Sequence, residues 1–551
     1  MSKPAKKYSP ENPQKRIEEH PAILIGKHPT KDSFLASYGQ TYVMLAAPPG
    51  TGKTVGVVIP NLLSYPDSVV VNDPKFENWN KTSGFRAAAG QKVFRFSPEL
   101  LETHRWNPLN QLDRSELYRL GQIRTLASVL FVSDNPKNQE WYNKAANVFS
   151  AILLYLMETP EYPFTLPQSY EISSLGTGIG AWAHQVIELR STGPQALSAE
   201  TRRELNGVLE ASKNKSSGWS TTVDILNQVL CVYAEKTVAW AVSGDADSPD
   251  NIDFSKLREE KTSVYFCVSA KQIKKFGPLM NLFFTQAIQE NIVVMPEDGG
   301  NCADGTLRLK YQVLFVLDEI AVMGRVEILE IAPALTRGAG LRYIIIFQGK
   351  DQLRSERTYG KEAGNGIMQA FHIEIVYGTG NVDLAKEYST RLGNTTVRVQ
   401  NQSLNKQRHE IGVRGQTDSF SEQARPLLFP QEISELPYAE ELIFVEATNM
   451  YPASKIRARK IVWFEEEIFK ARANLPMPHL PIGDKSKIDS LTIPVRTVDK
   501  KAAVAAPHAQ QLQQEHQKRW TPGAGAGVAE ASPAIQPNPE PPAIDESFDG
   551  L

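Results

Sequence analysis

Eight residues near the start of the chain have the types and spacing of a phosphate-binding loop. Two glycines, Gly50 and Gly52, allow the backbone to turn successive N–H groups toward phosphate oxygens. The lysine that follows can reach the β- and γ-phosphates, and the next hydroxyl can ligate Mg²⁺. An alanine replaces the first glycine of the pattern, which is acceptable if its φ stays negative. The sequence predicts a site for ATP and Mg²⁺ built from Ala47, Pro48, Pro49, Gly50, Thr51, Gly52, Lys53 and Thr54.

A pair of acids, Asp318 and Glu319, supplies the second half of this chemistry. The apolar run 313–317 leads directly into them, as in a buried strand that ends at the ligand-binding edge of an α/β sheet. We expect Asp318 to hold Mg²⁺ through water and Glu319 to polarise the water that attacks the γ-phosphate. Two acids after a strand are common, but together with the loop they predict an ATPase.

Two further residues are candidates for the catalytic set alongside Lys53 and Glu319. Gln348 ends the apolar run 343–347, where an amide can contact the γ-phosphate or the attacking water; the alternative is a plain strand cap. Arg337 lies beyond the acidic pair next to a glycine and could act across a subunit boundary as an arginine finger. Arg325 and Arg342 compete with it, and a surface arginine is an equal alternative.

Three basic clusters could line a channel for DNA. Each can also be an ordinary solvated face. The clusters are Lys271/Lys274/Lys275, Lys455/Arg457/Arg459/Lys460, and Lys213 with Lys215.

The elements that must position these residues follow from the apolar pattern. A short apolar run at 42–46, the loop, and the apolar stretch 55–63 indicate a strand, a turn and a helix, although Pro60 should kink or end that helix. Further short apolar runs at 68–71, 261–270, 311–317 and 341–347 alternate with helical stretches. This pattern predicts an α/β fold with a parallel sheet covered on both faces.

The chain divides into five expected segments. Residues 1–22 are polar and form a flexible leader, and residues 23–112 begin a nucleotide-binding domain. Residues 113–240 have helical periodicity and few strand candidates, which indicates an inserted all-α domain. The nucleotide-binding domain resumes over 241–475. Residues 476–551 are rich in Pro, Ala, Gln and Gly, end in an acidic stretch, and are expected to be disordered.

Composition narrows the class of protein further. A net charge of −2 provides no overall field that would draw the chain onto nucleic acid, so DNA binding would need a local patch. Three widely spaced cysteines without a CxxC pair argue against a disulfide framework or a zinc site and fit a reducing cytoplasm. No run reaches the ~20 apolar residues of a membrane span, and the polar start lacks the centre of a signal peptide.

Several motifs beyond the ATPase pattern give the chain a resemblance to the TraG-like coupling ATPases of conjugation and type IV secretion, a group within the FtsK/HerA superfamily. The resemblance covers about residues 22 to 470. The motifs that carry it, in order, are Val55–Leu63, Val69–Trp79, Gly84-Phe85-Arg86, Asn107-Pro108-Leu109, Ser216–Thr221, Val313–Glu319, Gly340–Gln348, Tyr388–Val397, Ala424–Leu428 and Tyr451–Arg459.

The resemblance implies a RecA-like P-loop domain with an inserted all-α domain, assembled as a homohexamer at the cytoplasmic face of the bacterial inner membrane. It implies ATP hydrolysis coupled to delivery of relaxase-bound single-stranded DNA, or of protein substrates, into a type IV secretion channel. Members usually begin with membrane-spanning helices, and none is present in this sequence. Either this is a soluble member or the sequence begins after the anchor.

Two alternatives to a coupling motor remain open from the residues. The first is an FtsK-type pump for double-stranded DNA, which should carry a winged-helix module that the Pro/Ala-rich tail does not resemble. The second is a recruitment platform in which ATP binding is structural and the acidic tail and helical insertion dock partners. Intact Lys53 and Glu319 argue against the platform.

Overall fold

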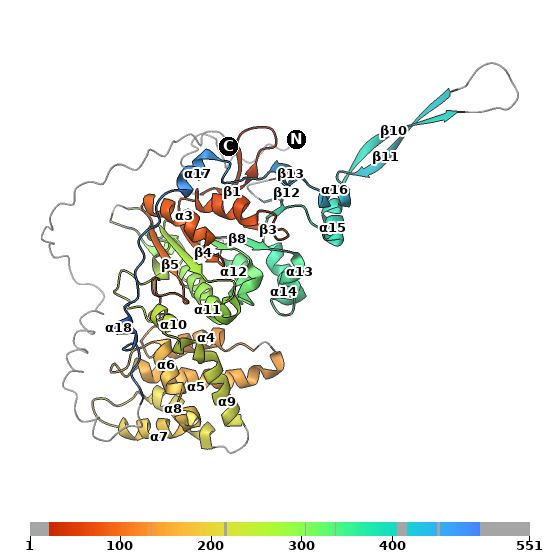
Figure 1. Cartoon of the computed structure of the whole chain (residues 1–551). Helices are drawn as coiled ribbons and strands as arrows, with labels where there is room; N and C mark the ends of the chain where they lie inside the picture. Colours follow the sequence, from red (N-terminus) through yellow and green to blue (C-terminus); the bar gives the residue numbers. More distant parts are fainter. Residues whose placement is uncertain are drawn as a thin grey trace, which may run out of the picture.

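The structure is a computed structural model that describes residues 21–133, 135–213, 218–303, 305–336, 338–404, 416–448 and 452–495. Its centre is an eleven-stranded sheet (Figure 1) with the order β2-β1-β13-β12-β9-β3-β8-β7-β4-β6-β5. The strands are β1 (Ile23–Lys27), β2 (Phe34–Ser37), β3 (Val43–Ala46), β4 (Ser68–Asp73), β5 (Lys92–Phe96), β6 (Thr262–Cys267), β7 (Val313–Leu317), β8 (Leu341–Phe347), β9 (Ile373–Val376), β12 (Glu440–Val445) and β13 (Ser454–Arg459).

The sheet has a parallel part and an antiparallel extension. Strands β5 to β9 and β3 and β4 pair in parallel, which brings their carboxyl ends to one edge. Strands β12, β13, β1 and β2 add antiparallel pairs beyond β9. The parallel strands are almost wholly apolar because both faces of the sheet are buried. The predicted α/β class is confirmed.

Helices cover both faces, and successive strand residues divide between two cores. In β3, Val43 and Leu45 join the core beneath α2 (Ile59–Leu62) and α3 (Glu77–Ala88), whereas Met44 and Ala46 face the opposite core. That opposite core includes residues of α11 (Ile273–Ile292), α12 (Ile328–Leu335) and α14 (Gly360–Gln369). Short helices α13 (Lys350–Arg354) and α17 (Glu467–Ala473) complete the covering.

Pro60 does not break the helix after the phosphate-binding loop in the way we expected. A π-helical turn over Thr54–Val58 comes first, and Pro60 occupies the first turn of the short α-helix α2 that follows it. The proline therefore follows directly on a wider π-helical turn, in which the Ile59 N–H bonds to the Thr54 carbonyl. The helical segment still ends early, at Leu63.

The stretch predicted to be an all-α insertion contains only helices and turns among its described residues. They form the lower part of the molecule in Figure 1, and their apolar faces belong to the same core cluster as one face of the sheet. The helices are α4 (Arg119–Leu130), α5 (Gln139–Met157), α6 (Leu166–Ser173), α7 (Ile179–Leu189), α8 (Ala199–Lys213), α9 (Gly218–Leu230) and α10 (Lys236–Ala241).

Two of the motifs outside the ATPase pattern serve the fold. Arg86 is fully buried and donates hydrogen bonds to the carbonyls of Leu62, Tyr65 and Asp67, which ties the end of α2 to the start of β4. Asn107 accepts from the backbone N–H of Leu109 and donates to the carbonyl of Phe164, at the entry to the helical part. Such buried polar groups need these partners to offset desolvation.

A long hairpin that the sequence did not predict projects from the globular part (Figure 1). Its strands β10 (Asn394–Leu404) and β11 (Gln416–Pro426) pair only with each other. It is flanked by α15 (Val382–Leu392), which Asn381 caps, and by α16 (Pro430–Ser434).

The expectation of a disordered tail from residue 476 is wrong for residues 476–495. This segment runs along the molecule from the sheet to the helical part and contains α18 (Lys485–Ile488). Pro481 and Gly483 bond to the backbone of Thr103 and Leu101, and Ile493 bonds to Gln168 through both its N–H and its carbonyl. Polar backbone contacts, rather than a run of apolar residues, order it. Residues 496–551, and residues 1–20 of the expected leader, lie outside the described residues.

Candidate nucleotide-binding site

The predicted phosphate-binding loop lies between β3 and the π-helical turn, at the carboxyl edge of the parallel strands. Gly50 and Gly52 adopt φ values of 77° and 85°, which only glycine reaches without strain. Ala47 is buried against the sheet and is not among the described residues with positive φ, so the substitution of the first glycine is tolerated. The loop closes on itself through a 2.7 Å hydrogen bond from the Thr51 hydroxyl to the Pro48 carbonyl.

The structure brings the loop and the acidic pair together. The Thr54 hydroxyl donates to Oδ2 of Asp318 at 3.0 Å, and Nζ of Lys53 lies 3.4 Å from Oε2 of Glu319. These contacts join residues that are more than 260 positions apart in the sequence. β7, which carries the acids, is separated from β3 by one strand, β8, so its end faces the loop.

Gln348 belongs to the same cluster. It follows β8, and its side-chain amide donates to Oε2 of Glu319 at 3.2 Å. Glu319 itself has φ 58° and ψ 58°, a left-handed conformation that costs about 1–3 kcal/mol for a residue with a side chain. Its Oε1 is buried without a hydrogen-bond partner among the described residues, so the carboxylate keeps one free acceptor.

Two residues of β4 that we did not predict as site residues lie near Asp318. The Asn72 side chain donates to the Asp318 carbonyl at 2.8 Å. Asp73 is buried nearby and accepts from the backbone N–H of Trp79 at 2.8 Å. The sequence offers only a weak signal for these two residues, a polar pair at the end of a short apolar run. It does not reveal that β4 and β7 are neighbours, because that depends on the strand order of the sheet.

Burial controls the ionisation of both aspartates. Desolvation raises the pKa of Asp318 to about 6, and the charge of Glu319 adds to that rise, whereas the Thr54 hydrogen bond opposes it. Desolvation likewise raises the pKa of Asp73 to about 6, with the Asp318 charge as a smaller contribution. A divalent cation at this position would reverse this balance, since it favours the carboxylate form.

A lysine that we had placed in a basic surface cluster supports the loop from beneath. Nζ of Lys460 donates to the Thr51 carbonyl at 3.2 Å and lies 3.6 Å and 4.7 Å from the ring centres of Tyr377 and Tyr438. Burial lowers the pKa of Lys460 to about 8, against the opposing effect of Glu441. Tyr438 also limits the loop, because a Cβ at Gly52 would lie 2.6 Å from its hydroxyl.

The arginine candidates have different outcomes. Arg337 lies outside the described residues. Arg342 is fully buried and donates to the carbonyls of Pro21 and Ser37, so it serves the fold rather than a neighbouring subunit. Arg325 is half-exposed and pairs with Glu330 at 2.9 Å. The assignment of the finger to Arg337 therefore stays a prediction.

Several members of the basic clusters bond to other groups of the chain, which neither a DNA channel nor an ordinary solvated face requires. Lys455 donates to the Leu392 carbonyl, Arg457 pairs with Glu440, and Arg459 donates to the carbonyls of His28 and Lys31. Lys275 pairs with Glu235 and Lys213 with Glu210, and Lys215 lies outside the described residues.

The residues present fit Mg²⁺ and a nucleoside triphosphate. A hydroxyl and a carboxylate converge, and oxygen ligands of this kind are the ones that Mg²⁺ takes alongside phosphate oxygens and waters. No atom would meet a Cβ at Gly50, so the outer side of the loop is open for a phosphate chain. The described residues contain no cluster of three or more His, Cys, Asp or Glu that could hold a metal alone.

The sheet order, the loop and the acids at the ends of neighbouring strands define a RecA-like P-loop nucleotide-binding protein. A family model described as type IV secretory system conjugative DNA transfer matches residues 5–481. The chain belongs to this family, the coupling proteins of conjugative DNA transfer.

Individual relatives and solved structures agree with this family. A conjugal transfer protein TraG of Escherichia coli is 26% identical over 503 residues, which cover 84% of this chain and 75% of the relative. A VirD4 protein of Agrobacterium fabrum is 26% identical over 462 residues, which cover 82% of this chain and 62% of the relative. The plasmid coupling protein TrwB, solved with the ATP analogue ADPNP, has the same fold, with a TM-score of 0.52, 14% identity and coverage of 80% of this chain and 94% of TrwB. No described helix is both long and apolar enough to cross a bilayer.

Proposed function

We infer that this chain is an ATP-driven coupling protein. It recruits relaxase-bound single-stranded DNA, protein substrates, or both, and delivers them to a type IV secretion channel during conjugation. The observation that carries this inference is the convergence of Thr54 on Asp318 and of Lys53 on Glu319 in a chain of this family. Relatives support the nucleotide, since TrwB has been solved with ADPNP and with ADP and Mg²⁺.

Each residue of the site has a distinct task. Bound Mg·ATP supplies the phosphoanhydride bond that is cleaved. The loop N–H groups and Lys53 hold its phosphates, and Thr54 and Asp318 hold the metal. Glu319 takes the proton of the attacking water. Gln348, hydrogen-bonded to Glu319, registers whether the γ-phosphate is present.

The assembled state is part of the proposal. We expect a homohexamer in which Arg337 of one subunit completes the site of its neighbour. We expect it to act at the cytoplasmic face of the bacterial inner membrane, held there by secretion-channel components. The support is the family resemblance.

The test is the ATPase rate per subunit as a function of protein concentration, with and without single-stranded DNA, for wild type and Lys53→Ala. A shared site predicts a rate that rises with concentration and with DNA and vanishes in the variant. A rate that is flat, independent of DNA and unchanged by Lys53→Ala would contradict the motor and favour the recruitment platform. Family membership already favours a coupling protein over an FtsK-type pump.

A further inference from the structure

The helical part of the molecule carries a groove that the nucleotide site does not use. It has a volume of about 540 Å³ and lies between helices α4, α5, α8 and α9. This volume is within the range of sites that hold small ligands or a few side chains of a peptide. The motif Ser216–Thr221, which the ATPase chemistry leaves unexplained, contributes Trp219 to its wall.

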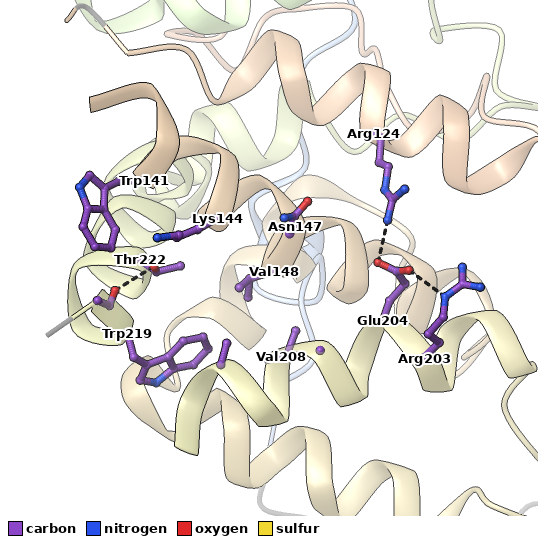
Figure 2. A pocket seen from close by; sticks show the side chains of 13 residues that line it. Arg124, Trp141, Lys144, Asn147, Val148, Arg203, Glu204, Val208, Trp219 and Thr222 are labelled. Atoms are coloured by element: carbon purple, nitrogen blue, oxygen red, sulfur yellow. Dashed lines mark hydrogen bonds and ion pairs between the residues drawn. The ribbon is translucent and has the colours of Figure 1, made fainter. Parts of the chain in front are cut away.

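The groove combines an apolar floor with aromatic walls. Val148 and Val208 are buried beneath it, and the rings of Trp141 and Trp219 stand at one end (Figure 2). Trp141 packs on Gly218, where a Cβ would lie 2.9 Å from the ring, so this glycine permits the ring position. Half-buried aromatic rings beside an apolar floor suit an aromatic or aliphatic side chain of a ligand.

The rim of the groove is basic. Arg124 and Arg203 lie at the end away from the tryptophans, both paired with Glu204 at 3.1 Å and 3.3 Å (Figure 2). Lys144 lies 4.2 Å from the ring centre of Trp141. Lys144 also pairs with Glu140 at 2.8 Å, so three cations face two carboxylates and the rim keeps a small net positive charge. The carboxylates and the apolar floor make the groove a poorer track for a nucleic-acid backbone than for a peptide with separate acidic and apolar side chains.

The chain itself contains a segment with this chemistry. Residues 539–551 include four acids, Glu540, Asp545, Glu546 and Asp549, and no basic residue. Phe548 and Ile544 supply the aromatic and aliphatic side chains. The pattern of an apolar side chain between acids matches a groove with an apolar floor and a basic rim.

The described chain before this segment ends beside the helical part that carries the groove. Val495, the last described residue before it, packs against the core that includes the helical part, and Ile493 is bonded to Gln168 of α6. Residues 496–538 lie between Val495 and the acidic segment, and a chain of that length can span up to about 140 Å. Attachment to the same domain raises the effective concentration of the segment to the order of millimolar, so weak contacts suffice.

We propose that residues 539–551 bind in this groove of their own chain, with Phe548 on the tryptophan side and the acids at Arg124, Arg203 and Lys144. The proposal does not depend on ATP hydrolysis or on DNA delivery.

The experiment uses the full-length protein with Phe548 replaced by the photoreactive p-benzoylphenylalanine, which keeps the aromatic shape. After illumination at dilute concentration, mass spectrometry should map cross-links within one chain to α5, α8 or α9. The same photoreactive residue at Gln511, in the intervening segment, is the reference for random encounters.

Two matched pairs of variants make the result specific. At Gly207, on α8 in the groove, a Cβ would meet no atom within 4 Å, so Gly207→Leu fills the groove without a clash; Gly121→Leu on α4 is equally open and does not line it. We expect at least a fivefold loss of cross-link with Gly207→Leu and none with Gly121→Leu. Arg203→Glu should reduce it several-fold, whereas Lys213→Glu on the same helix should not.

Three outcomes would overturn the proposal. Cross-links from position 548 that match those from position 511, or that persist in Gly207→Leu, would show that the groove is not the site. Cross-links that join two chains would assign the groove to a second copy. Displacement of the cross-link by an oligothymidylate, with oligothymidylate binding itself lost in Gly207→Leu, would assign the groove to single-stranded nucleic acid.

Discussion

The side-chain ammonium of Lys460 donates a 3.2 Å hydrogen bond to the carbonyl of Thr51, in the middle of the phosphate-binding loop. The bond links the antiparallel extension of the sheet to the nucleotide site, since Lys460 directly follows β13. The ammonium also lies over the ring of Tyr377, which is buried under Gly56. We therefore expect this donor to restrict the conformation of the loop before a nucleotide arrives.

Replacing Lys460 should therefore weaken nucleotide binding without removing any group that touches phosphate. Lys460→Met keeps the apolar stem and removes the donor. A hydrogen bond from a charged group contributes about 1.5–3 kcal/mol, and partial solvation of the freed carbonyl recovers part of that free energy. We therefore expect the affinity for a fluorescent ATP analogue to fall about 5- to 30-fold. Lys455→Met, on the preceding strand β13 and bonded to the Leu392 carbonyl, is the control and should bind normally. Equal affinities in both variants would show that the loop is preorganised by its own contacts.

Glu319→Gln should separate binding from hydrolysis. The amide keeps the size of the side chain but cannot take a proton from water, so we expect ATP hydrolysis to fall about 10²- to 10⁴-fold, with ATP affinity retained. Glu327→Gln, an exposed acid a few residues further on, should hydrolyse normally.

The same variant distinguishes a motor from a platform in cells. A motor arrested with ATP bound should abolish transfer when donor cells carry only Glu319→Gln in place of the wild-type chain. Unimpaired transfer, with hydrolysis lost in vitro, would mean that delivery needs ATP binding alone.

The parts of the site that the sequence predicts are those that depend on local spacing. Gly50, Gly52, Lys53 and Thr54 lie within one turn of chain, and the backbone conformation that they need is a property of the residues themselves. The apolar run before Asp318 likewise predicts a buried strand that ends in acids. Both patterns can be read without knowing which strands are neighbours.

The parts that the sequence does not predict depend on long-range pairing. Asp73 reaches the site because β4 pairs with β7, and Lys460 does so because β13 is added through β12 to the far side of β9. The ordered segment 476–495 has the composition of a linker and is held at isolated points, such as Ile488 and Gly483. The overall composition of a segment does not reveal such individual contacts, so a prediction from composition gives disorder here.

The ionisation of Asp318 predicts a pH dependence for metal-assisted binding. Its pKa of about 6 lies above the ordinary value of 3.8, so the free protein takes up a proton there as the pH falls through about 6. Mg²⁺ needs the carboxylate and must displace that proton. Affinity for Mg·ATP should be constant above pH 7. Below pH 6 it should fall about tenfold per pH unit, because each binding event must then release one proton from Asp318. Titration calorimetry at several pH values, with ATP in EDTA as the control, measures this. A profile that is flat down to pH 5 would contradict the buried, protonated state.

The same carboxyl has the opposite effect on the stability of the protein without metal. A pKa that is higher in the folded than in the unfolded state means that folding favours the protonated form. The contribution of Asp318 to the free energy of unfolding should therefore rise as the pH falls from about 6 toward 3.8. Asp318→Asn should remove this dependence, which urea unfolding at pH 5 and pH 7.5 can test.

Gln168 is the residue on which the ordered segment 476–495 depends where it meets the helical part. Its side chain is fully buried and binds both the N–H and the carbonyl of Ile493, at 2.7 Å and 2.9 Å. Gln168→Leu keeps a buried apolar stem and removes both bonds, which together contribute about 1–2 kcal/mol to holding the segment. Amide exchange over residues 484–495 should then be about tenfold faster, since 1.4 kcal/mol corresponds to a factor of ten.

Gln228→Leu, at an exposed position of α9, should leave exchange unchanged. Because Thr492 also bonds to Glu171 of α6, the loss should centre on Ile493 and fade toward Gly483, which is held separately by Leu101. Equal exchange in wild type and Gln168→Leu would mean that apolar contacts of Ile488 and Val495 alone hold the segment in place.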